Sequence, residues 1–439
     1  MKAVKYIVCG ILLLGCLFGW YRQFSVLKDI KTEVENYITA AEKSLSQGLY
    51  KQAIENYKSA LEIKDDVEIW KDIQVAYLKY IDEDSNLKIV REFSDDMLLA
   101  ISKHPKESIF YISVLNQLIE SGDIRSAKRI TDLARKNNVK NDEISEISKQ
   151  LTYMTKIDYR RWSSVLTSLN GYYVVSSNSL SIILDSDGEE ISDRYEFISA
   201  VNSSGFAVVK NDRGYRLIDR SGIERAVLPD NLSYAGTYDE ISRIVPICAD
   251  DKWYLFSIDK GILPGSFDYA STFTNDIAVV LKNSKWNFID TSGSIIEELP
   301  FEDIKLSLSG EYIQSGLILA KLYGKWHLFN SDLAQIGELS ADKIDIFNGG
   351  LIAFEQNGKW GFSDKTGTIV KTPEYVGAKS FSNGFAGICD NNDVWGFINS
   401  DFELVIPCQF NEVGYFSSNR ICYVIADSAA YQRLYFVLD

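Results

Sequence analysis

Histidine is almost absent from this sequence: its 439 residues include only His104 and His327. Two imidazoles leave little material for a histidine-containing metal centre, a Ser-His-Asp triad or a histidine general base. The six cysteines show no Cys-x-x-Cys spacing, so neither a zinc site nor a disulfide framework is supported. We therefore expect no catalytic residue, no metal and no cofactor, and we interpret the chain as a protein that is not an enzyme.

Positive charge is also in short supply. The sequence has 46 Lys and Arg against 61 Asp and Glu, a formal net charge of -15. A surface that binds nucleic-acid phosphates needs an excess of basic residues, which argues against a nucleic-acid partner. Phosphate-binding loops and the G-x-S-x-G elbow are missing as well. These absences favour a binding protein over a nucleotide-dependent or hydrolytic enzyme.

One long apolar run is present, at the N-terminus. Tyr6 to Tyr21 carry no charge, and Trp20-Tyr21-Arg22 is typical of the interface that closes a membrane span. Residues 1–22 are therefore predicted to be an uncleaved, single-pass signal anchor, followed by a linker over residues 23–33. Leu13-Leu14-Gly15-Cys16 resembles a lipoprotein box, so the alternative is a lipoprotein attached through Cys16. Either way, the bulk of the chain is predicted to lie outside the cytoplasm.

Residues 34–156 show helical periodicity with small residues at fixed offsets. Two copies, separated by a degenerate copy at about 68–107, resemble tetratricopeptide repeats, and residues 141–155 are predicted to form a capping helix. The resemblance implies pairs of antiparallel helices that offer either a short peptide-binding groove or a spacer. The positions that define the two copies are Gly48, Ala53 and Ala60, and Gly122, Ala127 and Ala134.

From about Tyr159 the period changes to two, and a strand-turn-strand unit recurs over residues 157–439. The same slot in successive units is 33 to 40 residues apart, and the longest interval is that from Trp286 to Trp326. We assign Leu180, Tyr215 and Leu434 to the same slot in the remaining units, which favours a core position over a row of ligand contacts. The tryptophans that define the slot are Trp253, Trp286, Trp326, Trp360 and Trp395.

This unit resembles the bacterial WG-repeat family, also called KWG repeats. The resemblance is strongest at Lys359-Trp360-Gly361-Phe362 and at Val394-Trp395-Gly396-Phe397. Other units replace the glycine by Tyr254, Asn287 or His327. Such short units must stack to be stable, and we predict a β-propeller of seven or eight blades, with a β-solenoid as the alternative. Residues 159–168 are predicted to complete the last blade, so that both ends of the domain share it.

Together these patterns predict a multidomain fold: a membrane helix, tetratricopeptide-like helices and an all-β repeat domain. We expect a scaffold on the bacterial cell membrane that binds a protein partner, and the alternative is a protein that binds glycan or cell wall. An enzyme has the least support. The repeated Asp-x-x-Gly segments, such as Asp219 to Gly222, and Asp185 with Asp187 are predicted to be turns and not catalytic or calcium-binding sites. Specificity is expected in the variable loops between units.

Overall fold

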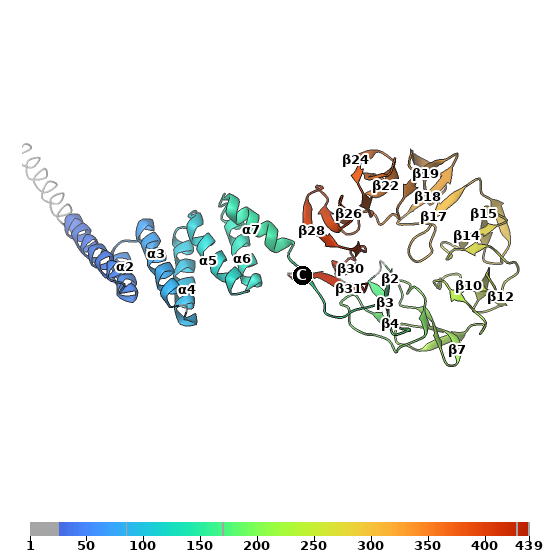
Figure 1. Ribbon diagram of the computed structural model, residues 1–439, viewed down its shortest axis with the longest axis horizontal. Coiled ribbons are helices and arrows are strands. Elements are labelled where there is room, and N and C mark those ends of the chain that lie inside the picture. Colours follow the sequence, from blue (N-terminus) through green and yellow to red (C-terminus); the bar gives the residue numbers. More distant parts are fainter. Residues whose placement is uncertain (1–25, 85, 169–170, 427–428, 438–439) are drawn as a thin grey trace, which may run out of the picture. The chain divides into compact units, whose positions relative to one another are not determined.

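The computed structural model describes residues 26–84, 86–168, 171–426 and 429–437 (Figure 1). The predicted anchor, residues 1–22, lies outside this part of the chain. Within it, no helix combines the length and apolar character needed to span a membrane. The chain divides into two compact units, one ending at Thr152 and one spanning Tyr153–Val437.

The described part of the first unit consists of helices joined by short turns. Aspartate or asparagine side chains begin several helices: Asp66 accepts a hydrogen bond from the Glu68 N–H, and Asn86 accepts one from the Lys88 N–H. The described helices are residues 26–46, α2 (Tyr50–Ile63), α3 (Val67–Glu83), α4 (Leu87–Lys103), α5 (Ser108–Glu120), α6 (Ile124–Lys136) and α7 (Asp142–Thr152).

Consecutive helices from α2 to α7 pack against each other as helical hairpins. Ala53 and Ala60 on α2, and Ala127 and Ala134 on α6, are completely buried. Side chains this small allow two helices to approach closely. The assignment of these hairpins to the tetratricopeptide family stays a prediction.

The second unit consists of eight small antiparallel sheets arranged in a ring, which we call blades 1 to 8 (Figure 1). Blade 1 contains β2 (Ser164–Ser168), β3 (Tyr172–Ser177) and β4 (Leu180–Leu184), and blade 2 contains β5 (Phe197–Ile198), β6 (Ala207–Asn211), β7 (Gly214–Ile218) and β8 (Glu224–Val227). Blade 3 contains β9 (Tyr234–Ala235), β10 (Ile244–Ala249), β11 (Lys252–Ser257) and β12 (Gly261–Ile262). Blade 4 contains β13 (Tyr269–Ala270), β14 (Ile277–Lys282), β15 (Lys285–Asp290) and β16 (Ile295–Glu298).

The remaining blades continue the ring in chain order. Blade 5 contains β17 (Asp303–Lys305), β18 (Leu317–Leu322), β19 (Lys325–Asn330) and β20 (Gln335–Leu339), and blade 6 contains β21 (Lys343–Ile344), β22 (Ile352–Gln356), β23 (Lys359–Ser363) and β24 (Ile369–Tyr375). Blade 7 contains β25 (Gly377–Ala378), β26 (Phe385–Cys389), β27 (Trp395–Asn399) and β28 (Leu404–Phe410). Blade 8 contains β29 (Glu412–Val413), β30 (Ile421–Ile425), β31 (Gln432–Phe436) and β1 (Thr155–Ile157).

Blade 8 is built from both ends of the β unit, as the sequence predicts. β1 pairs with β31, with Lys156 opposite Tyr435, and supplies the outer strand. The predicted segment is shifted, however. The strand that completes the blade precedes residues 159–168, while β2, inside that segment, is the first strand of blade 1. A bridge between Trp162 and Tyr431 extends the junction.

The apolar core lies between the blades. In the described residues eight clusters of buried side chains occupy the eight junctions of neighbouring blades. The cluster that closes the ring joins Ile421 and Tyr423 of blade 8 to Tyr173, Val175 and Ile182 of blade 1. Because every blade buries its two faces against two neighbours, the unit is a closed eight-bladed β-propeller and not a solenoid.

In blade 6 the structure explains why glycine follows tryptophan. The pairing of β23 with β24 is shifted between Trp360 and Phe362, so the outer strand bulges towards its neighbour. A Cβ atom at Gly361 would lie 2.5 Å from the carbonyl oxygen of Lys371 and 2.7 Å from the nitrogen of Pro373. Both are backbone atoms that cannot move independently, so glycine is required there.

Blade 7 repeats this arrangement, and blades 4 and 5 do not. A Cβ atom at Gly396 would lie 2.6 Å from the carbonyl oxygen of Ile406. At the same position in blades 4 and 5, Asn287 and His327 pair directly with their outer strands, where a side chain has room. The departures from Trp-Gly in those two blades therefore follow from the shape of the outer strand.

Replacing Gly361 with valine is expected to lower the free energy of unfolding by about 3 kcal/mol, because the new side chain overlaps backbone atoms. Urea unfolding followed by tryptophan fluorescence measures this, since six of the eight tryptophans lie in the β unit. His327→Val introduces the same residue at the same position of blade 5 and should stay within about 1 kcal/mol of the wild type. Equal effects of both variants would contradict the account.

Candidate functional site

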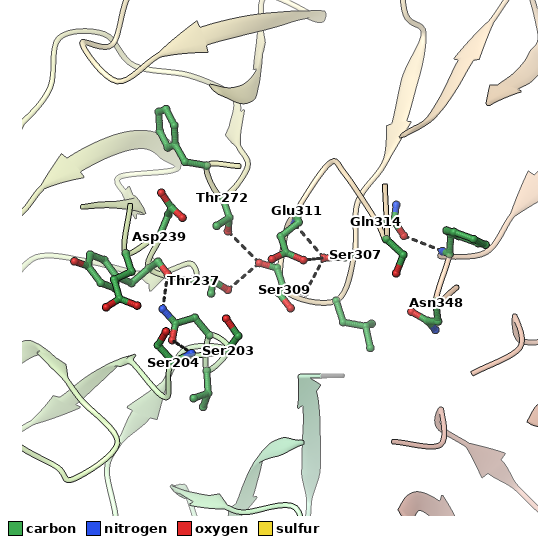
Figure 2. Close-up of a pocket in the computed structure, with 18 of the residues that line it drawn as sticks. Ser203, Ser204, Thr237, Asp239, Thr272, Ser307, Ser309, Glu311, Gln314 and Asn348 are labelled. Carbon is green, nitrogen blue, oxygen red and sulfur yellow. Dashed lines mark hydrogen bonds between the residues drawn. The ribbon is translucent and has the colours of Figure 1, made fainter. Parts of the chain in front are cut away.

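The connections between the first and second strands of six consecutive blades, 2 to 7, surround a cavity of about 560 Å³ (Figure 2). In blades 2 to 7 the first strand lies nearest the middle of the ring, so these connections meet around it (Figure 1). The lining comes from residues 201–204, 237–241, 272–273, 307–309 with Glu311, Gln314 and Ser315, 347–348 and 382–383.

The longest of these connections is in blade 5, and its residues 307–311 form a loop that reaches blades 3 and 4. We call it the crossing loop. The carbonyl oxygen of Ser309 accepts hydrogen bonds from Thr237 Oγ1 at 2.8 Å and from Thr272 Oγ1 at 3.0 Å (Figure 2). The N–H of Thr272 donates to the carbonyl oxygen of Gly310 at 3.0 Å. The 40-residue interval between Trp286 and Trp326 therefore contains an insertion that forms one wall of the cavity.

Further hydrogen bonds fix the other walls. Asn202 Nδ2 donates to the carbonyl oxygen of Tyr238 at 3.1 Å, which joins blade 2 to blade 3. Gln314 Oε1 accepts from the N–H of Phe347 at 2.9 Å, which joins blade 5 to blade 6. Ser382 Oγ donates to the carbonyl oxygen of a blade 8 residue at 2.7 Å. Side chains thus satisfy backbone groups that no sheet pairs, and the cavity is preformed.

The cavity is acidic. Asp239, Glu240 and Glu311 line it, and none of its described lining residues is Lys or Arg. Burial raises the pKa of the Glu311 carboxyl; a hydrogen bond from Ser307 acts in the opposite direction, and the nearby Asp239 carboxylate raises that pKa further. A positive charge beside Glu311 would offset both the cost of desolvating the carboxylate and the repulsion from Asp239.

A second cavity of about 560 Å³ adjoins the first and shares Phe347, Asn348 and Asn383 with it. At the boundary, Asn348 Nδ2 is buried and has no hydrogen-bond partner in the described part of the chain. A buried amide N–H without an acceptor costs free energy, so a turn of this partly exposed side chain that brings the amide to a carbonyl or water oxygen in the cavity would be favourable.

The five predicted tryptophan positions lie away from the cavity. Trp286 and Trp326 are buried, while Trp253, Trp360 and Trp395 are partly buried. They lie at the beginning of the third strand, at the opposite end of the blade from the connections that form the cavity. None of the five tryptophans lines the cavity.

The Trp395 ring packs over Gly377 of its own blade, because a Cβ atom at Gly377 would lie 2.9 Å from it. Lysines before the tryptophans are mainly exposed, and Lys252 pairs with Asp268 at 2.7 Å.

Two of the residues assigned to the tryptophan slot were wrong. In blade 3 the slot residue, Trp253 on the third strand, pairs with Cys248 on the second strand. Cys248 pairs on its other side with Tyr234 on the first strand. In blade 1 the corresponding second-strand residue is Ser176, which pairs with Ser164 on the first strand and with Ser181 on the third. Ser181 therefore occupies the slot, and the neighbouring Leu180 is 38% exposed. Blade 8 places Tyr431 there, bridged to its outer neighbour, and Leu434 lies three residues further along β31.

The corrected slot is aromatic in blades 2 to 8, and only Ser181 in blade 1 departs from this. The inference that any large apolar residue serves there therefore fails.

The glycines of the helical repeats occupy turns. Gly48 and Gly122 have φ values of +74° and +76°, and a Cβ atom at either position would have open space around it. Left-handed backbone, and not close helix approach, is what calls for glycine there. The Asp-x-x-Gly segments are turns as predicted: Asp219 Oδ1 accepts from the Ser221 N–H at 2.8 Å, and Asp364 Oδ1 from the Thr366 N–H at 2.8 Å.

These features define a class, a closed repeat β-propeller with a polar cavity at one end, consistent with a protein-interaction scaffold. The particular repeat follows from the comparison with known families. A family model described as WG containing repeat matches residues 262–286, 342–360, 360–392 and 395–426, so the C-terminal region carries WG-containing repeats, as the motifs predicted. The bacterial origin stays a prediction.

Several solved structures are similar in shape. Kluyveromyces lactis Hsv2 is 10% identical over 56% of this chain and 96% of its own, with a TM-score of 0.35. The β-propeller domain of Cps50 (Swd1) from Myceliophteria thermophila is 11% identical over 65% and 100%, with a TM-score of 0.36. A eukaryotic initiation factor is 12% identical over 61% and 79%, with a TM-score of 0.42. No curated protein matches the chain.

Proposed function

We propose that the chain is a non-catalytic binding scaffold whose propeller takes a protein partner at the cavity between blades 2 and 7. The observation that carries this proposal is that connections from six consecutive blades converge on one preformed polar cavity. Hydrogen bonds between blades hold those connections in place, as Thr237 and Thr272 do for the crossing loop. A rigid ring that presents variable connections is well suited to recognition.

Two carboxylates in one cavity are also the equipment of a glycoside hydrolase, which makes that class the strongest enzymatic alternative. Against it, Asp239 Oδ2 accepts a hydrogen bond from the Ser242 N–H at 2.7 Å, and Glu311 accepts one from Ser307. The rings of Tyr238 and Phe273 at the cavity wall are 4% and 2% exposed, so they offer no face on which a sugar could stack. Binding is therefore the better account.

We also propose that the chain is held at the bacterial cell membrane by residues 1–22, with the rest outside the cytoplasm. The support is the uncharged run from Tyr6 to Tyr21 with its Trp20-Tyr21-Arg22 boundary. Attachment through Cys16 is the alternative. The helical unit contributes either a second binding surface or a spacer. Its cavity of about 300 Å³ beside Trp70, bordered by Lys58 and Asp96, favours the former.

Glycan binding remains a second candidate because of one observation on the propeller. Tyr234, Trp253 and Tyr269 form a row across blades 3 and 4, with ring centroids 5.6 Å and 4.9 Å apart. Tyr234 is 41% exposed, which leaves part of its ring available for a sugar. Under this alternative Tyr234→Ala should abolish retention of isolated cell wall and leave protein binding unchanged.

The test is an affinity capture with the full chain against envelope proteins and against isolated cell wall. Ser203 is exposed and lines the cavity, so Ser203→Trp should fill it and abolish capture of the partner. Ser331 is an exposed serine outside the cavity lining, in the turn between β19 and β20, and Ser331→Trp should capture the partner as the wild type does.

Equal capture by the two serine variants would place the partner elsewhere and overturn the proposed site. Failure of the wild type to retain any specific protein would overturn the scaffold function itself. A form without residues 1–22 should lose its membrane association in the same preparation, and its continued presence in the membrane fraction would refute the anchor.

A further inference from the structure

The cavity has a strong imbalance of charge. Three of its lining residues carry carboxylates, and no lining residue in the described chain carries a positive charge. Arg243 lies just beyond the lining residue Ile241, but Asp259 holds it through two hydrogen bonds of 2.8 and 3.0 Å. That guanidinium is therefore already paired and does not neutralise the cavity.

Glu311 is the most informative of the three acids. It forms no ion pair with any residue in the described ranges, and its side chain accepts a hydrogen bond from the Ser307 hydroxyl at 3.3 Å. The N–H of Glu311 donates to Ser307 Oγ at 3.1 Å, so the carboxylate is fixed on the crossing loop. A partly buried carboxylate kept in place without a cation is an incomplete pair.

Blade 6 supplies a different group to the cavity wall. Asn348 Nδ2 is buried, unpaired within the described residues and shared by both cavities. This nitrogen donates hydrogen bonds, so it does not bind a cation. A ligand that satisfies Glu311 and Asn348 must carry a positive charge at one point and a carbonyl oxygen at another.

A peptide with a basic side chain has both groups. On these grounds we propose that the cavity binds a basic peptide segment, with a Lys or Arg side chain against Glu311 and Asp239 and a peptide carbonyl oxygen on Asn348. This rests on the proposed scaffold function and specifies the chemistry of its partner. Free polyamines lack the carbonyl, and neutral sugars lack the charge.

The test uses two pairs of capped tripeptides with the full chain, measured by calorimetry at low salt. Acetyl-Gly-Arg-Gly-amide is compared with its citrulline counterpart, and acetyl-Gly-Lys-Gly-amide with its acetyl-lysine counterpart. The modified side chains keep the size and lose the charge. At least one basic peptide should bind saturably, with its neutral counterpart at least about tenfold weaker, which corresponds to about 1.4 kcal/mol.

Variants assign the binding to the cavity. Glu311→Gln and Asp239→Asn keep their side-chain acceptors and should each weaken the basic peptide about tenfold or more. Glu297→Gln removes the same charge from β16, outside the cavity lining, and should bind as the wild type does. Asn348→Ala should weaken basic and neutral peptides by the same factor.

Equal binding of charged and neutral peptides, or full binding by the Glu311→Gln, Asp239→Asn double variant, would overturn the inference. So would the absence of binding by both basic peptides. If the peptide experiment fails but Ser203→Trp still abolishes partner capture, the proposed scaffold function stands and only the basic-peptide inference is overturned. Failure of that capture in the wild type removes the scaffold function instead, so the two failures are distinguishable.

Discussion

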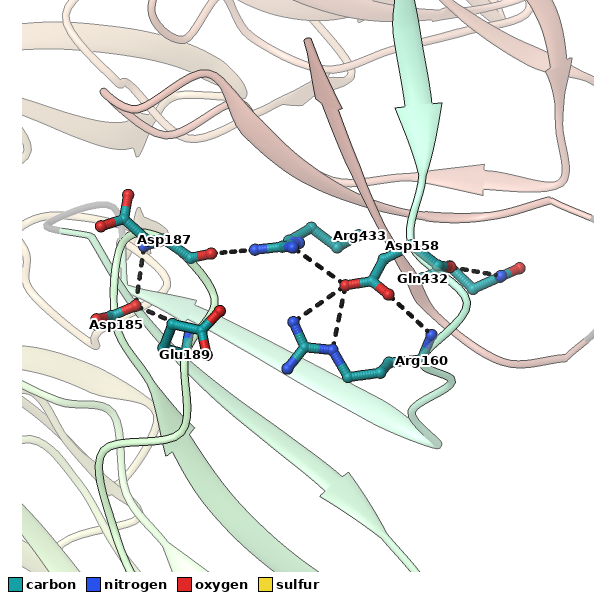
Figure 3. A network of polar contacts seen from close by, with 7 residues as sticks. All are labelled: Asp158, Arg160, Asp185, Asp187, Glu189, Gln432 and Arg433. Carbon is teal, nitrogen blue, oxygen red and sulfur yellow. Dashed lines mark hydrogen bonds and ion pairs between the residues drawn. The ribbon is translucent and has the colours of Figure 1, made fainter. Parts of the chain in front are cut away.

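Replacing Asp158 with asparagine should lower the free energy of unfolding of the propeller by about 3 kcal/mol. Asp158 follows β1, and its side chain is 8% exposed. Its Oδ2 lies 3.0 Å from Arg160 Nη2 and 3.1 Å from Arg433 Nη2 on β31 (Figure 3). Asparagine keeps the shape and removes the charge, which leaves two guanidinium groups facing each other in a site with little water.

The same carboxylate also links the closing blade to blade 1. Arg433 donates to the carbonyl oxygen of Asp187, in the turn after β4, while it pairs with Asp158 (Figure 3). Gln432 Nε2 donates to the carbonyl oxygen of Asp158 at 3.0 Å. Loss of the charge should therefore loosen a junction between the two ends of the ring, and not one side chain alone.

This contribution depends on pH. Burial acts to raise the pKa of Asp158, but hydrogen bonds from Arg160 and the charges of Arg160 and Arg433 outweigh it and hold the pKa below its ordinary value. A lowered pKa gives stability that is present above the unfolded-state value of about 3.9 and is lost as the pH falls through the folded-state value. The difference between wild type and variant should thus be constant at neutral pH and shrink below about pH 4.

Urea unfolding by tryptophan fluorescence at pH 7 and at low pH measures both effects. Asp259→Asn is the matched control, because Asp259 pairs with Arg243 through two hydrogen bonds and both side chains are at least half exposed. Its expected cost is below about 1 kcal/mol. If Asp158→Asn costs no more than Asp259→Asn, the closing network does not stabilise the ring.

The propeller could be predicted because the signals of each repeat lie close together in the sequence. Local turn signals such as Asn357-Gly358 recur along the chain, and seven of the eight units carry an aromatic residue in the slot. What could not be predicted is register. Leu434 was misplaced because the hairpin of blade 8 is longer than the others. Leu180 was misplaced because the slot of blade 1 holds Ser181, which gives no aromatic signal, and a shift of one residue reverses the face that a strand residue occupies.

The cavity could not be predicted from the sequence, for a different reason. Its walls come from segments as far apart as Asn202 and Asn383, which meet only because the ring closes. No short motif contains Asp239 and Glu311 together. One signal was available: the longest interval, between Trp286 and Trp326, contains the crossing loop, and variable loops were the predicted place of specificity.

Proline at position 156 should lower the free energy of unfolding of the propeller by about 3 kcal/mol. The N–H of Asp158 donates to the carbonyl oxygen of Arg433 at 2.8 Å, and the N–H of Val437 donates to that of Met154 at 2.9 Å. Hydrogen-bonded pairs alternate along antiparallel strands, so Lys156, midway between them and opposite Tyr435, belongs to the hydrogen-bonded set. Proline removes that donor from β1, the strand that closes blade 8.

Lys156→Ala is the control, because it removes the lysine side chain and keeps the backbone N–H that pairs β1 with β31. The Lys156 side chain is exposed, so alanine should cost less than about 0.5 kcal/mol in the same urea titration. Amide hydrogen exchange of β31 gives a second readout, because a detached β1 leaves the N–H of Tyr435 without its acceptor. If Lys156→Pro changes neither the unfolding midpoint nor the protection of β31, then pairing of β1 does not seal the ring, and the eight junctions between blades hold it closed by apolar packing alone.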